Sequence, residues 1–324
     1  MVTSLSRDNR VFLTGASGFL GSHVLRELLA AGYAVRALAR PSTRYARSGQ
    51  APDGVEWVEG DLRSVGGFAR ALVGCRYLVH CAALYSFAPR DRRAMHAINV
   101  RGTAGLMLAA HLAGVERAVL TSSSATLGHA QSGYHRSKLE QERAAFASRS
   151  PVVALLPTAP IGPGDWKPTP TGKLVLDFLR GRIVAKAPGA GGMNLVAVED
   201  VARAHLAALT WGRVGERYVI GGENLSLDRI WEMLSQATGK PLPRRRAPYA
   251  LALAAGYADE LRCRLDPRAI PSVPLEGVRM SREAMYADSE PARRDLRYVA
   301  TPVRDAIARA VAWYRDNGYA EAVH

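Results

Sequence analysis

The sequence predicts an α/β protein with a doubly wound parallel sheet and a smaller, discontinuous C-terminal lobe. Three observations support this prediction: a glycine-rich turn between the first apolar run and the first helical run, a regular alternation of such runs, and a change in composition after residue 157. Strands and helices that alternate at this spacing are typical of right-handed βαβ units, whose strands lie parallel in one sheet. The chain has 324 residues and 48% hydrophobic content, which is enough to bury a full core.

The first half of the chain supplies the expected strands and helices in order. An apolar run at residues 10–15 predicts the first strand, and residues 18–32 predict a helix that ends at a glycine. Longer helical patterns cover residues 92–113 and 133–147. The other expected strands, which are short and rich in apolar or β-branched residues, are residues 34–40, 55–61, 77–83, 117–123 and 152–157.

The second half of the chain differs in composition from the first, and this difference predicts the smaller lobe. Residues 157–172 are rich in proline and glycine and indicate a loop excursion. Residues 194–212 and 216–222 are expected to return to the main sheet, and helical pieces follow from about residue 225. The expected sheet domain therefore comprises residues 8–158 and 193–222, and the expected second lobe comprises residues 159–192 and 223–324.

The composition limits the classes of partner. Lys and Arg number 43 against 29 Asp and Glu, which gives a formal net charge of +14 and favours anionic ligands. The arginines are scattered, however, and neither zinc-finger spacing nor an RNA-binding aromatic signature accompanies them, so we expect no nucleic-acid partner. Cys75, Cys81 and Cys263 are too few and too scattered for a disulfide framework or a metal site, which fits a reduced compartment.

Neither a signal peptide nor a membrane span is expected. The first ten residues are polar and lack the apolar core of a signal peptide. A membrane-spanning helix needs about 18 or more apolar residues, and no run in the chain approaches that length. The longest candidate, residues 249–258, has only ten residues. These observations predict a cytoplasmic protein.

Three glycines stand between the first expected strand and the first expected helix, with the spacing G-x-x-G-x-x-G. The first allows a tight turn, the second lets the backbone approach a pyrophosphate, and the third lets the helix pack closely on the strand. The helix N-terminus adds N–H groups and the positive end of a dipole. A purely structural turn is the alternative, but this position in a βαβ unit favours a dinucleotide site. Its residues would be Gly15, Ser17, Gly18, Phe19, Leu20 and Gly21.

The end of the second expected strand indicates which dinucleotide binds. An acidic residue at this place serves the ribose 2′-hydroxyl of NAD, whereas arginine suits the 2′-phosphate of NADP. This chain has no acid there but has Arg40, Arg44 and Arg47. Since guanidinium groups match phosphate geometry by bidentate hydrogen bonding, NADP(H) is favoured over NAD(H). A solvated basic loop is the alternative, above all for Arg47.

Further segments extend these motifs over nearly the whole chain. They include "GDL" from Gly60, "HCAA" from His80, "NVRGT" from Asn99, "TSS" at the end of an expected strand, and Tyr134-x-x-x-Lys138. With the glycine turn, they resemble the extended short-chain dehydrogenase/reductase family. Within it the chain is most similar to the dihydroflavonol 4-reductase-like branch, and there to the hopanoid-associated sugar epimerases.

The resemblance implies roles for several residues and an assembly state. Asp61 and Leu62 would contact the adenine, Ala82 would lie along the cofactor, and Pro157 would border the nicotinamide. Asn99 would brace a helix rather than take part in the chemistry. The family resemblance also favours a monomer or a homodimer.

Tyr134 and Lys138 acquire a mechanism beside a nicotinamide. Their spacing of four puts both side chains on one face of a helix. A free tyrosine has a pKa of about 10, and a nearby ammonium should lower it. Lys138 could also hydrogen-bond the nicotinamide ribose. Tyr134 would then protonate a carbonyl oxygen as hydride arrives, and a serine would polarise that oxygen; the alignment favours Ser123, with Ser124 as the alternative. The other possibility is a surface tyrosine with a solvated lysine.

The substrate is constrained only by a short connection. Tyr134 lies 11 positions after Ser123, whereas extended family members carry a longer, acidic loop there. An open side of the site favours a bulky, largely apolar carbonyl substrate, with Tyr85, Phe87 and Trp166 as candidate contacts, although Trp166 could equally anchor its own loop. We therefore expect an NADP(H)-dependent oxidoreductase that reduces a ketone or aldehyde. The alternatives are an NAD-dependent sugar epimerase and a catalytically silent NADP(H)-binding scaffold or sensor.

Overall fold

A seven-stranded parallel sheet with the strand order β3-β2-β1-β4-β5-β6-β9 forms the larger part of the protein. The computed structural model describes residues 9–40, 54–86, 88–128, 133–183, 185–186, 189, 191–266, 273 and 275–320. Winding runs outward from β1 in both directions, so the predicted doubly wound, Rossmann-type sheet is confirmed. The strands are β1 (Arg10–Thr14), β2 (Ala34–Ala39), β3 (Val55–Glu59), β4 (Tyr77–His80), β5 (Arg117–Thr121), β6 (Val152–Pro157) and β9 (Arg217–Ile220).

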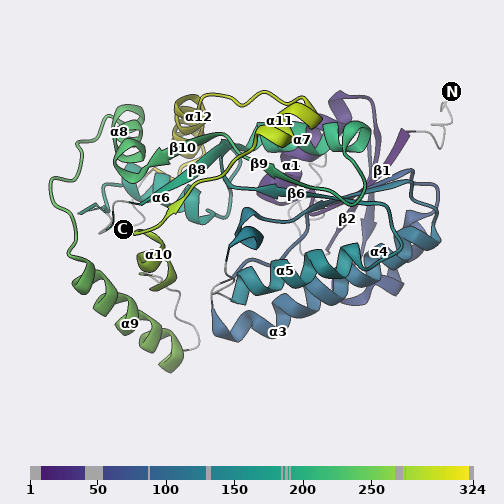
Figure 1. Cartoon of the computed structure of the whole chain (residues 1–324), viewed down its shortest axis with the longest axis horizontal. Coiled ribbons are helices and arrows are strands. Elements are labelled where there is room, and N and C mark those ends of the chain that lie inside the picture. Colours follow the sequence, from purple (N-terminus) through teal and green to yellow (C-terminus); the bar gives the residue numbers. More distant parts are fainter. Residues whose placement is uncertain are drawn as a thin grey trace.

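Helices cover both faces of this sheet (Figure 1). Successive residues of a strand point to opposite faces, and along β1 the side chains of Val11 and Leu13 join one core while Phe12 joins the other. The first core lies under α1 (Phe19–Ala30) and α7 (Val198–Trp211). The second lies under η2 (Leu62–Gly67), η3 (Ala69–Leu72), the π-helical turn η5 (His96–Gly102), α4 (Thr103–Leu112) and α5 (Gly133–Phe146). The short helix α3 (Arg92–Met95) leads directly into η5.

A smaller sheet forms the second lobe. Its central strand β8 (Gly192–Ala197) pairs with β7 (Ala159–Ile161), β10 (Glu223–Ser226) and β11 (Ala284–Met285). The third apolar core lies between this sheet and its helices and includes Trp231 and Tyr314. Those helices are α6 (Pro170–Leu179), α8 (Leu227–Thr238) and α12 (Val303–Asp316).

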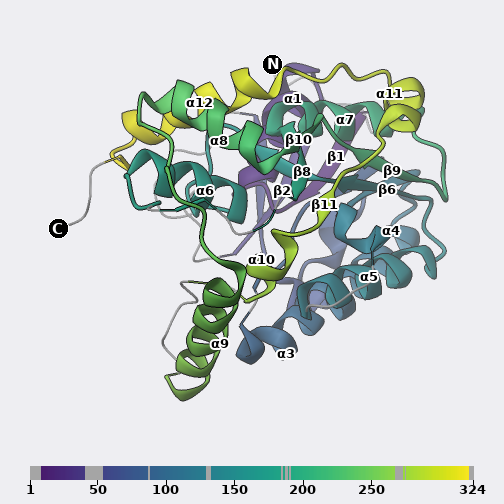
Figure 2. The same ribbon diagram turned by 60° about the vertical axis from the view of Figure 1, so that its left-hand side comes forward.

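Two further helices, α9 (Tyr249–Leu265) and α10 (Leu275–Met280), extend from the second lobe, as both ribbon views show (Figures 1 and 2). Another short helix, α11 (Glu290–Leu296), packs instead against α7 and β9 of the large sheet. None of the helices in the described part of the chain has the length and apolar character that a membrane span requires.

We expected residues 194–212 to return to the main sheet. This expectation is wrong for the strand β8 and correct for the helix α7, which packs on that sheet. β8 belongs to the smaller sheet, whereas α7 packs beside α1 and β9 pairs with β6. The sequence of β8 is a short, mostly buried and mainly apolar run, and such a run predicts a strand without indicating which sheet the strand joins. The sheet boundary in this region therefore falls within the range that we assigned to the larger domain.

Candidate active site

The glycine turn after β1 has a geometry that only glycine permits. Gly15 has a φ of +79°, and a Cβ atom built there would lie 2.7 Å from the backbone nitrogen of Ala82. A Cβ atom on Gly21 would overlap the carbonyl oxygen of Gly15, so α1 could not pack this closely on the turn. The Gly18 N–H donates to the same oxygen at 2.9 Å. Ser17 and Gly18 are exposed where α1 begins.

The start of α1 fits a pyrophosphate. Gly18 is the N-cap residue, no described side chain caps this helix end, and its first turn contains no acidic residue. Backbone N–H groups and the positive end of the helix dipole, including those at Phe19 and Leu20, are therefore available to an anion. A turn with glycine at its close-approach positions that leads into an uncapped helix N-terminus is what a bound dinucleotide needs. When bound, such a cofactor supplies or accepts a hydride.

The other predicted cofactor residues lie at the same edge of the sheet, where the carboxyl ends of parallel strands meet. Arg40 follows β2 and is exposed, and its charge helps to lower the pKa of Asp61, which follows β3. The largest cause of that lowered pKa is a hydrogen bond from Arg63, which pairs with the carboxylate at 3.0 and 2.8 Å. Leu62 is buried, Ala82 follows β4, and Pro157 ends β6. Arg44 and Arg47 lie outside the described residues.

Ser123 and Tyr134 come together at the end of β5. Tyr134 lies in the first turn of α5, and its hydroxyl is hydrogen-bonded to the side chain of Ser123. Ser123 also accepts a hydrogen bond from the N–H of Ala125 at 3.2 Å, and this contact caps the turn η6 (Ser124–Leu127). Ser124, our alternative serine, is the first residue of that turn. The ring of Tyr85 meets that of Tyr134 edge-on, with the centroids 4.5 Å apart.

Burial raises the pKa of Tyr134 to about 12, and the hydrogen bond with Ser123 offsets only part of that rise. Our expectation that Lys138 lowers this pKa is therefore wrong for the described structure. The ammonium of Lys138 donates instead to the carbonyl of Thr121 at 2.8 Å and to the side-chain oxygen of Gln141. The tyrosine consequently stays protonated at neutral pH, which is the form that can give a proton to a substrate oxygen.

Lys138 is itself fully enclosed, and desolvation lowers its pKa to about 7, an effect that the nearby Glu142 partly offsets. Glu142 is held by a hydrogen bond from Ser122 at 2.6 Å and by an ion pair with Arg217 at 2.6 Å. This lysine therefore gains or loses its proton near neutral pH, whereas a solvent-exposed lysine is fully charged there. Glu142 lies four positions after Lys138 on the same helix face, a spacing that could have signalled its role.

A chain of buried hydrogen bonds connects Lys138 to the end of β1. Gln141 donates to the hydroxyl of Thr103 at 3.0 Å, and Thr103 lies 2.8 Å from Nε2 of His80. The other ring nitrogen of His80 lies 2.6 Å from the hydroxyl of Thr14, the residue before the glycine turn. His80 is therefore a packed strand residue with a hydrogen-bond partner at each ring nitrogen. Sequence reasoning missed Gln141, whose only signal is its spacing of three from Lys138.

Asn99 braces the site as expected. Its buried side chain accepts from the N–H of Leu84 at 2.7 Å and donates to the carbonyl of Leu84 at 2.9 Å. The same amide donates to the hydroxyl of Ser137 in α5 at 3.1 Å. Asn99 lies in the π-helical turn, a backbone irregularity that often occurs at functional sites. The loop after β4, which carries Tyr85, is thereby attached to the helix that carries Tyr134.

The aromatic candidates separate into two groups. Tyr85 contacts Tyr134, is 41% exposed and therefore borders the reaction site. Trp166 packs edge-on against Trp313 at 4.7 Å, and its carbonyl accepts a hydrogen bond from Tyr319 at 2.7 Å. These contacts with the α12 region support the anchoring role of Trp166. Phe87 lies outside the described residues.

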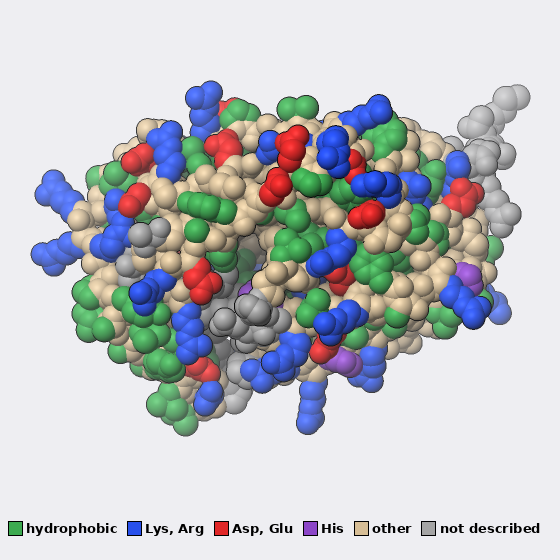
Figure 3. All heavy atoms as spheres, viewed as in Figure 1, with side chains coloured by type: hydrophobic (Ala, Val, Ile, Leu, Met, Phe, Trp, Pro, Cys, Tyr) green, Lys and Arg blue, Asp and Glu red, His purple; other side chains and the backbone are tan. Residues whose placement is uncertain are grey.

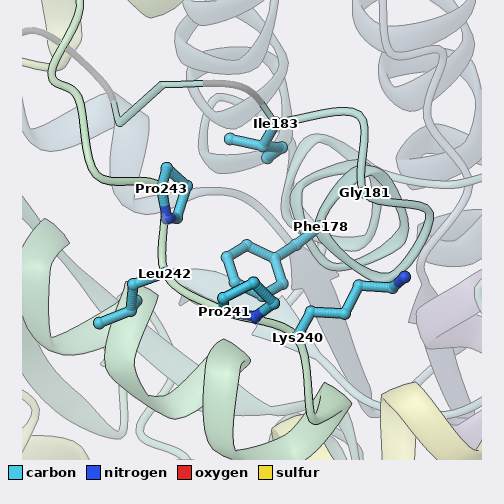
Figure 4. Close-up of a pocket in the computed structure, with 7 residues that line it drawn as sticks. All are labelled: Phe178, Gly181, Ile183, Lys240, Pro241, Leu242 and Pro243. Carbon is cyan, nitrogen blue, oxygen red and sulfur yellow. The ribbon is translucent and has the colours of Figure 1, made fainter.

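A hollow and two pockets mark the surface of the protein. The hollow lies between the two lobes, near α10 and the start of α5 (Figures 1 and 3). One pocket of about 760 Å³ lies between α1, α7 and residues 296–302. The other, of about 300 Å³, lies in the second lobe between the end of α6 and the segment after α8 (Figure 4). Neither is lined by a predicted site residue, and the smaller is lined by Phe178, Gly181, Ile183, Lys240, Pro241, Leu242 and Pro243.

A doubly wound sheet with a glycine turn, an uncapped helix N-terminus and a serine–tyrosine–lysine group defines a class of pyridine-nucleotide-dependent oxidoreductases. The sequence also matches the family model described as the NAD dependent epimerase/dehydratase family over residues 11–221. The chain belongs to this family, and the short-chain dehydrogenase/reductase resemblance is thereby confirmed.

Individual relatives match over both lobes. The chain is 39% identical over 332 residues to a candidate dihydroflavonol 4-reductase of Synechocystis sp., and the match covers 95% of each protein. It is 37% identical to sterol demethylase protein B of Methylococcus capsulatus, with 94% of this chain and 98% of that protein covered. The solved structure of gox2253 is 35% identical with a TM-score of 0.82, covering 96% of this chain and 99% of that one.

Replacing Tyr134 by phenylalanine should abolish turnover and leave dinucleotide binding nearly intact. The change removes the proton donor but keeps the aromatic ring, the glycine turn and Lys138. A general acid contributes about 10²–10⁴ in rate. Turnover is measured with a carbonyl substrate and binding by cofactor titration, with Tyr33→Phe as a remote control. A Tyr134→Phe enzyme that keeps more than about a tenth of wild-type turnover would contradict the role of Tyr134.

The stability of the protein should fall on acidification because His80 must stay neutral. Burial, aided by the charge of Lys138, lowers the pKa of His80 from 6.5 to about 3. Between these values the unfolded chain binds the proton and the folded chain does not, so the free energy of unfolding rises with pH. From pH 6.5 down to about 4.5, this one group should cost about 2 to 3 kcal/mol.

The measurement is urea unfolding of wild type and His80→Gln across that pH range. The variant lacks the titrating ring, so the gap between its unfolding free energy and that of wild type should narrow as pH falls. Leu108→Gln is the control, since Leu108 is 57% exposed on α4 and carries no titratable group, so its pH dependence should stay parallel to that of wild type. If the unfolding free energies of His80→Gln and wild type changed with pH in parallel, protonation of His80 would not destabilise the folded protein.

Proposed function

We propose that this oxidoreductase uses NADP(H) to reduce a ketone or aldehyde to an alcohol. The observation that carries the proposal is the hydrogen bond between the hydroxyl of Tyr134 and the side chain of Ser123, which follows the end of β5. A nicotinamide cofactor held at the Gly15–Gly21 turn would supply the hydride for the carbonyl carbon. The hydroxyl of Ser123 holds the substrate oxygen, and the phenol of Tyr134 delivers the proton as negative charge develops there.

Lys138 restores the active form of the enzyme in this proposal. After Tyr134 has given its proton to the substrate oxygen, its phenolate has to take up a proton from solvent before the next cycle. Because the pKa of Lys138 is about 7, this amine can take up and release protons at the working pH. Thr121 and Gln141 hold it in place through the cycle. In this proposal the larger domain (residues 8–158 and 193–222, apart from β8) binds the cofactor, and the second lobe provides the substrate contacts.

The proposed substrate is a bulky, largely apolar carbonyl compound. Tyr134 lies only 11 positions after Ser123, and so short a connection is expected to leave room beside the reacting oxygen. Tyr85 adds an exposed aromatic surface next to Tyr134. Similarity to a sterol demethylase protein over nearly the full length of both chains supports a polycyclic substrate class. We further propose that the enzyme works in the cytoplasm as a monomer or a homodimer.

The preference for NADPH should depend on Arg40. A charged hydrogen bond from its guanidinium to the 2′-phosphate contributes about 1.5–3 kcal/mol. Since about 1.4 kcal/mol is tenfold in affinity, wild type should bind NADPH about tenfold or more tightly than NADH. Arg40→Ala should remove most of that preference while barely changing NADH affinity, and Arg44→Ala should have a smaller effect.

Paired titrations of wild type and variants with both cofactors make this measurement. Arg229→Ala is a matched control, because Arg229 is an exposed arginine on α8 of the second lobe that pairs with Glu232. Equal affinity of wild type for NADH and NADPH would contradict the proposal. Tightly held NAD that co-purifies with the protein would favour the sugar epimerase, because an epimerase regenerates its cofactor internally.

Substrate size gives a separate test. Polycyclic and other bulky apolar ketones should be reduced with a higher kcat/KM than small nucleotide sugars, because the open side of the site accepts bulk and the Tyr85 surface is aromatic. NADPH oxidation is followed by absorbance with a panel of both substrate classes. Turnover of nucleotide sugars without turnover of bulky ketones would show that the substrate assignment is wrong.

A further inference from the structure

The helix α9 is set apart from the two sheets in both ribbon views (Figures 1 and 2). It contains 17 residues, and only Gly256 and Asp259 of them are buried. Gly256 allows Leu275 of α10 to approach, since a Cβ atom there would lie 3.1 Å from that side chain. The buried Asp259 accepts a hydrogen bond from the N–H of Val273 at 2.8 Å. One face of α9 is therefore attached to the protein through α10 and its preceding segment.

The opposite face of α9 is apolar and exposed to solvent. Leu251, Leu261 and Leu265 are 67%, 57% and 77% exposed. Together with the exposed Ala254 and Ala258, they recur at spacings of three and four residues and so form one stripe along the helix. Scattered exposed apolar residues are normal on a protein surface, but a continuous stripe of them marks an interaction surface.

Arginines surround this stripe. Arg244 and Arg245 are exposed in the segment that leads into α9, and Arg262 and Arg264 lie at its C-terminal end, paired with Asp259 and Glu260. From the other side, Arg279 and Arg282 reach the aromatic rings of Tyr257 and Tyr249. Figure 3 shows hydrophobic side chains along the lower left edge, where α9 lies in Figure 1, with basic side chains beside them.

We propose that α9 docks on the surface of a membrane that contains anionic lipids, with its leucine stripe inserted among the acyl chains. An apolar helix face bordered by arginine is typical of helices that lie in the membrane interface. The net charge of +14 adds attraction to an anionic surface. This inference is independent of the substrate and goes beyond the proposed reduction, but it would bring the enzyme to the phase in which bulky apolar compounds dissolve.

A second copy of the chain matches the α9 surface less well than a bilayer does. Helices that pair through such a stripe commonly select their partner by opposite charges at the flanking positions. The positions beside the stripe of α9 carry Ala250, Ala255, Tyr257, Arg262 and Arg264, so another α9 offers no acidic partner there.

The test is flotation of the full-length protein with two kinds of vesicle. One consists of equal parts phosphatidylglycerol and phosphatidylcholine, and the other of phosphatidylcholine alone. Wild type should float with the anionic vesicles at least tenfold more strongly than with the neutral ones, and high salt should reduce that binding because the attraction is screened. The triple variant Leu251→Ser, Leu261→Ser, Leu265→Ser should lose tenfold or more in vesicle affinity, because each leucine loses its transfer into an apolar phase.

A matched variant separates this surface from general stickiness. Val73→Ser, Val214→Ser and Val299→Ser remove three apolar side chains that are 54–80% exposed outside α9, and vesicle binding should not change. The double variant Arg244→Gln, Arg245→Gln should weaken binding to anionic vesicles only. The leucine-to-serine and the valine-to-serine triple variants should both keep the thermal midpoint and the carbonyl reductase activity of wild type. These two measurements show that the variants fold.

Several outcomes would overturn the membrane proposal. Wild type that fails to float, or a leucine triple variant that floats as strongly as wild type, would exclude docking through α9. A triple variant that changes the oligomeric state in light scattering without changing vesicle binding would assign the stripe to a second copy. If the wild-type protein showed no carbonyl reductase activity, the proposed reaction would be wrong, and the vesicle result would still stand.

Discussion

The buried ammonium group of Lys138 is the interaction on which the geometry of the site depends. Its hydrogen bond to the carbonyl of Thr121 attaches α5 to the end of β5. Ser123 follows Thr121 by two residues, and Tyr134 precedes Lys138 by one helical turn, so this contact helps to set both partners of the Ser123–Tyr134 hydrogen bond. An amine enclosed in protein is costly to keep charged unless acceptors surround it. Gln141 and Glu142 supply that environment from the same helix.

Burial has one common effect on the titratable groups of this site, which is to favour the neutral form of each. It raises the pKa of Tyr134, and it lowers the pKa of both Lys138 and His80. The consequence for chemistry is a phenol ready to donate and an amine that exchanges its proton near neutral pH. The consequence for structure is a neutral hydrogen-bonded chain from Thr14, beside the glycine turn, to Gln141, beside Lys138. The glycine turn and Lys138 are therefore connected by one chain of buried hydrogen bonds.

The two lobes differ in what they contribute. The large sheet carries every predicted catalytic and cofactor residue in the described part of the chain, because the carboxyl ends of its parallel strands meet at one edge. The second lobe has its own apolar core and an aromatic cluster in which Trp166 packs on Trp313. On its outermost helix, α9, three leucines are exposed to solvent instead of packing in that core. A fold of this kind separates catalysis from the surface that the protein presents to its surroundings.

Local features of the sequence determined the parts of this protein that depend on backbone conformation and spacing. Gly15 has a positive φ, and Tyr134 and Lys138 share a helix face, so the geometry of the glycine turn and the placement of this pair on α5 were predictable. Tertiary structure alone decided that β8 joins the smaller sheet and that Gln141 and His80 support the lysine. It also decided that the pKa of Tyr134 rises. These outcomes depend on desolvation and on contacts between distant segments, which local spacing does not encode.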